Sequence, residues 1–278
     1  MAPGPLARAR RGPPRGTPHP QASQQHQPGP RFAAPKGQEW LYGRNAVRES
    51  LRARRRGFRR LLIARGGARS GVMQEILGTV RELSVPIEEV ERVDLDGLTG
   101  GANHQGVCLL ASQYPYLPMV ELLRAPEHAF LLVLDSLQDP QNLGAVLRTA
   151  EAVSVTGVIM PEHRAAGVTP AVVNASAGAV EHVRVAQVVN LARTLDACKD
   201  AGVWVVGVEA APGAQPLWNV RLDGSLALVV GSEGEGIRRL VLEKCDVVAR
   251  LPLLGKVESL NAAVAAAVAL YEVVRRRA

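Results

Sequence analysis

Residues 226–236 read Leu-Ala-Leu-Val-Val-Gly-Ser-Glu-Gly-Glu-Gly, and this stretch decides the fold class. Leu226–Val230 is a continuous apolar run, which is typical of a strand covered on both faces in a parallel sheet. The glycines that follow allow positive φ and a close approach of the backbone to a ligand. Open parallel sheets bind ligands at the carboxyl ends of their strands. The stretch predicts a buried strand that ends in a ligand-binding loop, with a plain tight turn as the alternative.

The same strand pattern recurs on both sides of this stretch. Further strands are expected at Phe130–Leu134, Gly157–Met160, Val180–Val185, Val203–Val208 and Val247–Leu251. Helical patterns separate most of them, at Asn142–Val153, Asn190–Ala201, Gly236–Glu243 and Ser259–Arg275. Apolar strands that alternate with helices predict an α/β domain over residues 128–278, built on a mostly parallel sheet.

The chain ahead of this domain divides into a tail, a smaller α/β unit and a linker. Residues 1–37 hold nine of the 19 prolines and little apolar surface, so we expect a disordered, basic tail. Residues 38–113 are expected to form a compact α/β domain, with elements at 43–51, 60–64, 71–83, 85–90 and 106–111. Tyr114–Pro118 contains two prolines and predicts a stiff linker that extends over residues 114–127.

The charge distribution indicates a polyanionic partner. The formal net charge is +7, and residues 1–36 carry six basic side chains and no acidic one. A second cluster in the small domain is opposed locally only by Glu49, and consists of Arg44, Arg48, Arg52, Arg54, Arg55, Arg56, Arg59 and Arg60. Such surfaces bind nucleic acid through its phosphates. The pattern favours RNA or DNA over the alternative of a merely solvated basic face.

Other features narrow the class of protein. No apolar run reaches the length of a membrane span, and no apolar segment follows the basic N-terminus as it would in a secretion signal. Cys108, Cys198 and Cys245 lie far apart, without the spacing of a zinc or redox site. We expect a soluble cytoplasmic protein with no metal and with buried, unpaired thiols.

Three segments depart from plain α/β patterning, each after an expected strand. The first is residues 139–150, in which Asn142 and Arg148 stand out. Asn142 could be a helix N-cap, and Arg148 could be an exposed side chain paired with Glu151. The last of the three is residues 251–261, in which Ser259 and Asn261 could cap the final helix. The apolar side of that helix, at Leu260, Val264, Val268 and Tyr271, is expected to be core or subunit interface.

The segment between these two, residues 231–236, does not match either of the common nucleotide-binding motifs. Its glycines give GxxGxG, not the GxGxxG of dinucleotide-binding folds, and no Lys-Ser/Thr follows as in a phosphate-binding loop. Glu233 and Glu235 would also repel a phosphate. A neutral or cationic ligand suits this loop better, and a nucleotide hydrolase is disfavoured.

Together the three segments resemble the motifs of the SpoU/TrmH family of RNA ribose methyltransferases, in the SPOUT superfamily. The matches are Asp139-Pro140-x-Asn142-x-Gly144-Ala145-x-x-Arg148-Thr149-Ala150, then Gly231-Ser232-Glu233-Gly234-x-Gly236, then Leu251-Pro252 through Ser259-Leu260-Asn261. In the small domain, Tyr42–Val47 and His104-Gln105-Gly106 resemble the substrate-binding domain of the RlmB-type branch. That branch methylates a guanosine ribose in large-subunit (23S) ribosomal RNA.

The resemblance implies a fold and a cofactor. The catalytic sheet would thread a trefoil knot near its C-terminus, an exception to the rule that chains avoid knots. S-adenosylmethionine would lie bent within the knot, with the cofactor-binding positions at Gly231, Gly234, Gly236, Leu251 and Leu260. The enzymes of this family act as homodimers, with the C-terminal helix in the interface and the active site completed across it.

The resemblance also implies a catalytic set, carried over by motif position. Its members would be Asn142, Arg148, Glu233, Ser259 and Asn261. The family assigns Arg148 as the base for the ribose 2′-hydroxyl, but a guanidinium is effectively never deprotonated in proteins. We expect Arg148 instead to bind the adjacent phosphate and stabilise the developing alkoxide, with Glu233 and Asn142 orienting it and the ribose.

The leading interpretation is therefore an S-adenosylmethionine-dependent ribosomal RNA 2′-O-methyltransferase. A rival in the same class would methylate transfer RNA, or an adenosine at an antibiotic-binding site of ribosomal RNA. A rival from another class is a non-catalytic RNA-binding or ribosome-assembly protein. The intact catalytic set argues against the second rival, which would also have no need to bind S-adenosylmethionine.

Overall fold

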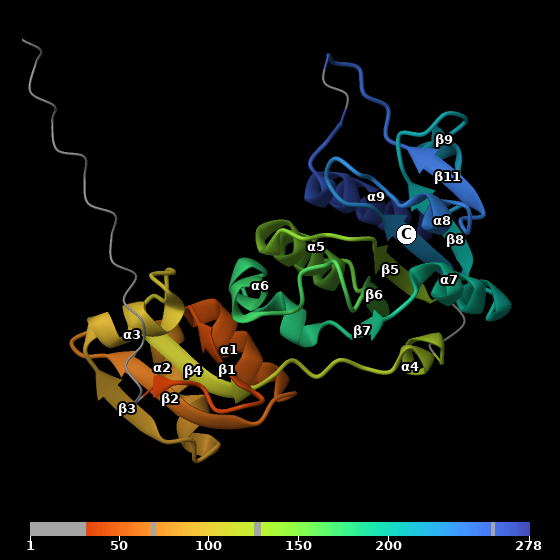
Figure 1. The fold of residues 1–278 in the computed structure, drawn as a ribbon. Coiled ribbons are helices and arrows are strands. Elements are labelled where there is room, and N and C mark those ends of the chain that lie inside the picture. The colour runs from red at the N-terminus through yellow and green to blue at the C-terminus, as the bar shows by residue number, and fades with distance from the viewer. Residues whose placement is uncertain (1–31, 68–70, 125–128, 257–258) are drawn as a thin grey trace, which may run out of the picture.

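The computed structural model describes residues 32–67, 71–124, 129–256 and 259–278. It contains two α/β units joined by an extended segment (Figure 1). No helix among the described residues combines the length and the apolar character that a membrane crossing requires.

The first unit is built on a four-stranded sheet in the order β1-β4-β2-β3. Strands β1 and β2 both run antiparallel to β4, and β3 runs parallel to β2. The strands are β1 (Gln38–Tyr42), β2 (Phe58–Ala64), β3 (Ile87–Val90) and β4 (Val107–Ser112), and the helices are α1 (Arg44–Ala53), α2 (Gly71–Glu82) and α3 (Arg92–Thr99). The expected elements are confirmed within a few residues, whereas β1 and α3 were not predicted.

The second unit contains a seven-stranded sheet in the order β7-β6-β5-β10-β8-β11-β9. All six neighbouring pairs are parallel. The strands are β5 (Phe130–Leu134), β6 (Gly157–Pro161), β7 (Val185–Val188), β8 (Trp204–Val208), β9 (Gln215–Pro216), β10 (Leu226–Val230) and β11 (Val247–Arg250). The α-helices are α4 (Met119–Leu123), α5 (Pro140–Ala152), α6 (Pro170–Ala175), α7 (Leu191–Asp200), α8 (Arg239–Leu242) and α9 (Ala262–Arg277). The predicted α/β class with a parallel sheet is confirmed.

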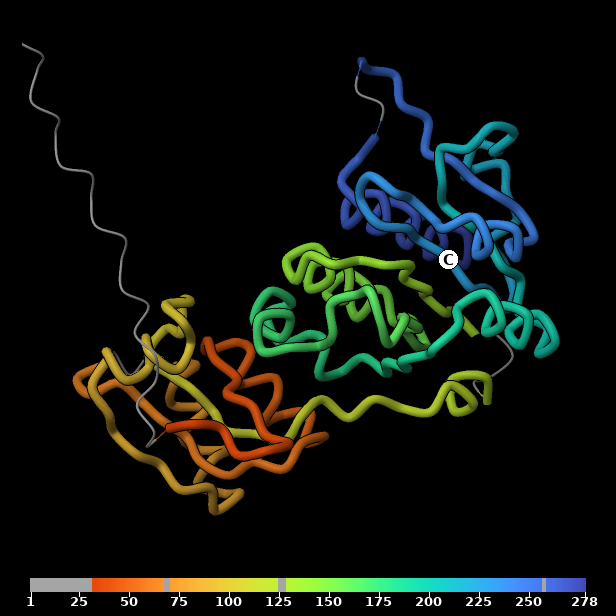
Figure 2. Tube along the Cα trace, in the orientation of Figure 1, coloured from red at the N-terminus to blue at the C-terminus, as the bar shows by residue number. Residues whose placement is uncertain are grey.

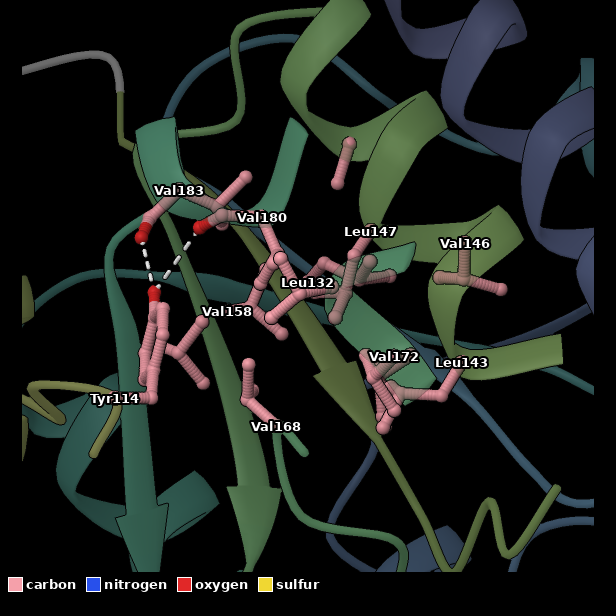
Figure 3. Packing of buried hydrophobic residues seen from close by; sticks show 14 of the residues in the cluster. Tyr114, Leu132, Leu143, Val146, Leu147, Val158, Val168, Val172, Val180 and Val183 are labelled. Carbon is pink, nitrogen blue, oxygen red and sulfur yellow. Dashed lines mark hydrogen bonds between the residues drawn. The ribbon is translucent and has the colours of Figure 1, made fainter. Parts of the chain in front are cut away.

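Strand β10 lies near the middle of this sheet and is buried on both faces, as its sequence predicts. Leu226, Leu228 and Val230 belong to one apolar cluster, whereas Ala227 and Val229 belong to the other. In the first cluster, Leu143, Val146 and Leu147 of α5 pack in the layer that covers Leu132 of the sheet (Figure 3). The strand ends at Val230, and the bridge between Ser232 and Gly236 closes the glycine loop directly after it.

Three sequence predictions in this unit were wrong in detail. Val180–Val185 is not one strand: Ala179–His182 forms a 3₁₀ turn after Gly178, whose φ is +87°, and the strand begins only at Val185. The helix expected from Gly236 starts at Arg239, because the backbone at Gly236 pairs with Ser232. The last helix begins at Ala262, three residues later than expected.

The end of the expected tail and the start of the linker both contact the packed units. Residues 1–31 of the expected tail and residues 125–128 lie outside the described part of the chain. Phe32 is buried, and its carbonyl accepts a hydrogen bond of 2.9 Å from Trp40 Nε1. The linker runs along the second unit (Figure 2), where Leu117 N donates to Val185 O at 2.8 Å. The trefoil knot stays a prediction of the resemblance.

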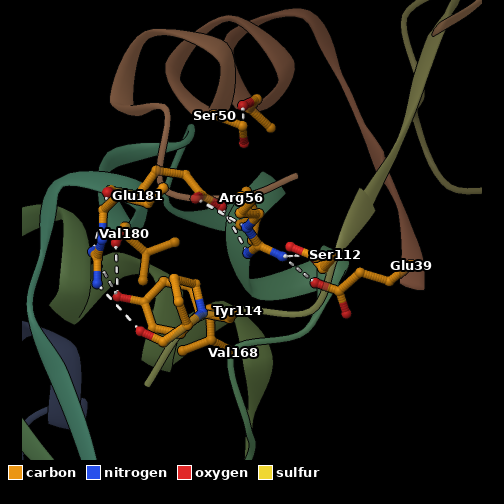
Figure 4. Close-up of polar contacts among 12 residues, drawn as sticks. Glu39, Ser50, Arg56, Ser112, Tyr114, Val168, Val180 and Glu181 are labelled. Atoms are coloured by element: carbon orange, nitrogen blue, oxygen red, sulfur yellow. Dashed lines mark hydrogen bonds and ion pairs between the residues drawn. The ribbon is translucent and has the colours of Figure 1, made fainter. Parts of the chain in front are cut away.

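A buried network of charged groups joins the two units (Figure 4). Arg56 Nε donates to Glu181 Oε2 at 3.0 Å, and Nη2 lies 2.7 Å from Oε1. Its Nη1 contacts Glu39 Oε1 at 2.5 Å and the Ser112 carbonyl at 3.0 Å. We call Arg56, Glu181, Glu39 and Ser112 the interdomain network.

This network corrects the prediction of a basic surface in the small domain. The Arg56 side chain is fully buried, and Arg55 donates to the backbone carbonyls of Glu181 and Pro115 at 3.2 and 3.3 Å. Arg52 and Arg60 form ion pairs with glutamates that are distant in sequence, Glu75 and Glu88. The arginine run is therefore divided between domain docking and surface ion pairs, and its members do not form one free cationic face.

Candidate functional site

The glycine loop after β10 forms a tight, closed turn. Ser232 and Gly236 pair as an antiparallel bridge, with N···O distances of 3.2 and 3.1 Å. Gly234 and Gly236 have φ of +87° and +65°. A Cβ atom at Gly231 would overlap the backbone of Gly236. A side chain at position 231 would therefore force the turn open, whereas positions 234 and 236 favour glycine because of their positive φ.

Two carboxylates from other strands anchor this loop. Glu209, after β8, accepts a hydrogen bond of 2.8 Å from Ile237 N. Asp135, after β5, is fully buried and accepts from Arg238 N at 2.8 Å and from Arg238 Nε at 2.7 Å. Because β5 and β8 flank β10, these anchors hold the loop at the carboxyl edge of the sheet.

A cavity of about 680 Å³ lies against the loop, and we call it the loop cavity. It is lined by residues that include all the predicted cofactor positions, Gly231, Gly234, Gly236, Leu251 and Leu260, together with Glu233, Ser259 and Asn261. Its volume lies within the range of small-molecule sites. Leucine side chains and the open backbone of glycines suit an adenine ring and its hydrogen bonds, so the residues fit the cofactor that the resemblance implies.

Three polar side chains converge at the edge of the loop cavity, and we call them the polar cluster. Asn261 Nδ2 donates to Asn142 Oδ1 at 3.0 Å and also to Glu233 Oε1. The same Glu233 oxygen accepts from Ala262 N at 3.2 Å. The three residues come from three separate motifs, which the fold brings into direct contact.

Helix ends position two members of this cluster. Asp139 is the N-cap of α5 and accepts from Asn142 N at 3.0 Å, which leaves the Asn142 side chain available to the cluster. The alternative of Asn142 as the cap is therefore wrong. Asn261 caps α9 through Oδ1, at 3.0 Å from Ala263 N and 3.2 Å from Val264 N. Its Oδ1 caps the helix, and its Nδ2 donates the hydrogen bonds within the polar cluster.

The two other predicted catalytic residues lie apart from this contact. Ser259 lines the loop cavity and is exposed. Arg148 is exposed on α5 and pairs with no described residue, Glu151 included. It lines neither the loop cavity nor a smaller cavity of about 250 Å³ that contains Asn142 and Glu233. An exposed guanidinium six residues along the helix from Asn142 can meet a ligand or a second copy of the chain.

Sequence reasoning missed Asp135, Glu209 and Arg238. Asp135 and Glu209 each follow directly the last residue of a strand, β5 and β8, at the edge where the ligand loop lies. A polar residue at that position was the available signal. Their contacts with Ile237 and Arg238 show that they support the loop.

Comparison with known proteins gives two family matches. Residues 129–271 match the SpoU rRNA methylase family, and residues 40–117 match the RNA 2′-O ribose methyltransferase substrate-binding domain. The chain is 43% identical over 243 residues to YacO of Bacillus subtilis, named as a TrmH family tRNA/rRNA methyltransferase, covering 86% of this chain and 96% of that protein.

Two solved structures share the fold. The SpoU methyltransferase AviRb from Streptomyces viridochromogenes, crystallised in complex with the cofactor AdoMet, aligns with a TM-score of 0.73 and 25% identity, over 87% of this chain and 91% of that one. A crystal structure described as an RNA 2′-O ribose methyltransferase aligns with a TM-score of 0.72 and 28% identity, over 87% and 90% of the two chains.

Proposed function

The chain belongs to the SpoU rRNA methylase family and is an S-adenosylmethionine-dependent RNA 2′-O-methyltransferase, and on that premise we propose that it methylates a guanosine ribose in large-subunit ribosomal RNA. The 3.0 Å contact between Asn261 and Asn142 beside Glu233, at the edge of the loop cavity, supports a catalytic site for ribose methylation. The resemblance of Tyr42–Val47 and His104-Gln105-Gly106 to the RlmB-type branch supports a guanosine of ribosomal RNA as the substrate. The match of residues 40–117 to a substrate-binding domain supports RNA as the partner. The cytoplasm is the compartment we propose, since ribosomal RNA is made there in bacteria.

S-adenosylmethionine supplies a methyl group on a sulfonium when it is bound. Gly231, Leu251 and Leu260 would hold it, with Gly234 and Gly236 keeping the loop closed around it. Methyl transfer to a hydroxyl requires a positioned nucleophile whose developing negative charge is stabilised. Asn142, Glu233 and Asn261 would position the ribose, and Ser259 would belong to the same site, since it lines the loop cavity.

Arg148 would act as an electrostatic stabiliser. Its guanidinium is exposed and offers only hydrogen-bond donors, so it can bind the adjacent phosphate and the forming alkoxide. We propose that it reaches the reacting ribose from a second copy of the chain. The exposed side of α9, with Val264, Val268 and Tyr271, is the proposed homodimer face.

The substrate is tested by mapping ribose methylation across total RNA, with and without the gene. Loss of one mark on a guanosine in 23S ribosomal RNA is the expected result. Loss of a mark in transfer RNA would make transfer RNA the substrate and leave the enzyme class unchanged. If every mark persists without the gene, the proposal is contradicted.

The role of Arg148 is tested by the pH dependence of the rate in wild type and Arg148→Lys. We expect the lysine variant to be slow at every pH, because it lacks the planar fork that binds a phosphate. A lysine variant that regains a rate with a new, lower apparent pKa would support proton abstraction at this position and overturn our assignment.

A further inference from the structure

A second cavity lies near the glycine loop and shares no lining residue with the loop cavity. It has a volume of about 540 Å³ and is lined by Ser136, Gln138, Arg164, Ala165, Ala166, Glu235 and Arg238. We call it the arginine pocket. Its residues come from the loops after β5, β6 and β10, which are neighbours in the sheet (Figure 1).

The cavities form a continuous series. A small cavity of about 250 Å³ contains Asn142 and Glu233 of the polar cluster. It shares Ser232, Glu233 and Ala262 with the loop cavity, and Ser136, Gln138 and Glu235 with the arginine pocket. A nucleotide whose ribose lies at the polar cluster, facing the methyl donor, would therefore place its base at the arginine pocket.

The walls of the arginine pocket are held in place before any ligand binds. Buried Asp135 fixes the Arg238 guanidinium through contacts of 2.7 Å. Ala166 N donates to Leu137 O at 2.9 Å, which ties the loop that carries Arg164 to the loop that carries Gln138. These contacts hold Arg238 and the backbone of the two loops in place, which reduces the entropy that the pocket loses on binding.

The pocket also offers unused hydrogen-bonding groups. Within the described part of the chain, the side chains of Arg164, Gln138 and Glu235 form no hydrogen bond or ion pair. Arg164 can only donate, the carboxylate of Glu235 can only accept, and Gln138 can do both. A site for a bare phosphate would have no use for the carboxylate, whereas a base edge presents donors and acceptors together.

We propose that the arginine pocket binds the base of the methylated nucleotide and selects guanine. The Watson–Crick edge of guanine carries two adjacent donors, N1–H and the 2-amino group, which match the two oxygens of Glu235. Its O6 and N7 are acceptors, which match Arg164. Adenine and cytosine offer Glu235 one amino group and no neighbouring ring N–H, and uracil offers a ring N–H alone. The inference rests on the ribose position proposed above and deepens it.

The first test identifies the labelled nucleoside. The full-length protein is incubated with S-[methyl-³H]adenosylmethionine and total RNA from cells that lack the gene, and the RNA is digested to nucleosides. We expect the label in 2′-O-methylguanosine. Label in another 2′-O-methylnucleoside overturns the guanine pocket while leaving the methyltransferase intact. Label in 2′-O-methylguanosine of transfer RNA leaves the pocket intact and overturns only the ribosomal substrate.

The second test assigns the residues. Glu235→Ala and Arg164→Ala are each expected to lower kcat/KM on that RNA by about tenfold to a hundredfold, the value of a lost bidentate base contact. Calorimetric titration should give wild-type affinity for S-adenosylmethionine, since neither residue lines the loop cavity. Glu162→Ala and Arg193→Ala, which change exposed residues outside the pocket, are the matched controls.

The third test uses the base itself. An RNA fragment with inosine in place of the target guanosine lacks the 2-amino group. The inosine fragment should slow the wild type by about tenfold and should slow Glu235→Ala no further than it already is. Equal slowing of both proteins by inosine, or loss of cofactor affinity in the pocket variants, would overturn the proposal.

Discussion

The interdomain network and the polar cluster each join segments that are distant in the sequence, yet they differ in burial. Arg56 and Glu181 in the network have side chains that are 0% exposed, whereas Glu233 and Asn261 in the cluster are exposed. In the network each charge meets an opposite charge, and Arg56 also binds a carbonyl. In the cluster one amide donates to both of its partners. Buried, compensated charges hold two domains in one arrangement, while an exposed cluster keeps hydrogen-bonding capacity for a ligand.

Breaking the network should have the largest effect on stability. Arg56→Met leaves the Glu181 carboxylate buried without its partner, which costs about 3–5 kcal/mol of unfolding free energy. Urea denaturation measures this loss. Arg59→Met changes an exposed neighbour and should shift stability by less than about 0.5 kcal/mol.

The double variant Arg56→Met/Glu181→Leu sharpens that result. It removes both charges, so much of the lost stability should return. If Arg56→Met were no more destabilised than Arg59→Met, the network would not hold the domains together.

Breaking the polar cluster should affect the rate and leave stability nearly unchanged. Glu233→Gln removes the charge proposed to orient Arg148 and the ribose, and we expect kcat/KM to fall about a hundredfold. The unfolding free energy should change by less than about 0.5 kcal/mol, because Glu233 is exposed. Glu162→Gln, which removes the same charge elsewhere on the surface, should match wild type in both measurements. A rate loss in the control as large as that in Glu233→Gln would contradict the assignment.

Asn261 contributes to stability and to the reaction rate through different atoms of one side chain. Asn261→Ala removes the N-cap of α9 and should cost about 1 kcal/mol as well as activity. Asn261→Asp keeps an oxygen for the cap but places a second carboxylate beside Glu233, so stability should return in thermal unfolding while the rate does not. Recovery of the rate in the aspartate variant would show that Nδ2 is not needed.

The smallest effect concerns Tyr114, at the edge of the interdomain network. Burial raises the pKa of Tyr114 to about 12, and its hydroxyl contacts the Val183 carbonyl at 2.5 Å. In the unfolded chain this phenol ionises near pH 10, so between pH 10 and 12 the folded state binds more protons. Its contribution to stability is therefore complete below pH 10 and is lost as the pH rises toward 12.

The Tyr114→Phe variant tests this pH dependence. It should cost about 1 kcal/mol at neutral pH and should flatten the decline in urea midpoint above pH 10. If the urea midpoint of Tyr114→Phe falls above pH 10 as steeply as that of wild type, other groups cause the decline.

Local patterns in the sequence predicted much of the fold. The apolar run at Leu226–Val230 predicted the strand correctly, because an uninterrupted apolar segment gains the most free energy when both faces are covered. The same reasoning failed at Val180–Val185. There the backbone turns after Gly178, and Val180 and Val183 are buried near Tyr114 without forming a ladder, which begins only at Val185. A hydrophobic pattern predicts which residues are buried more reliably than it predicts their backbone conformation.

The candidate site was predicted in part. The motifs identified Asn142, Glu233 and Asn261 as members of one site, and the resemblance carried that inference. Asp135 and Glu209 escaped it, because a carboxylate that anchors a backbone N–H has no spacing pattern of its own. The arginine run also misled, because charge in the sequence does not reveal whether a side chain is buried.

The sequence by itself determined the buried strand, the closed glycine turn and the helix cap at Asn261, because each follows from the chemistry of a few adjacent residues. Only the tertiary structure decided that Arg56 faces Glu181 and that Arg164 and Glu235 share a pocket. These pairings join residues 125 and 71 positions apart. The Arg164–Glu235 pairing arises from the order of parallel strands in a sheet, where loops distant in the chain meet at one edge. The Arg56–Glu181 pairing arises from the packing of one unit against the other. No local pattern of residues encodes either arrangement.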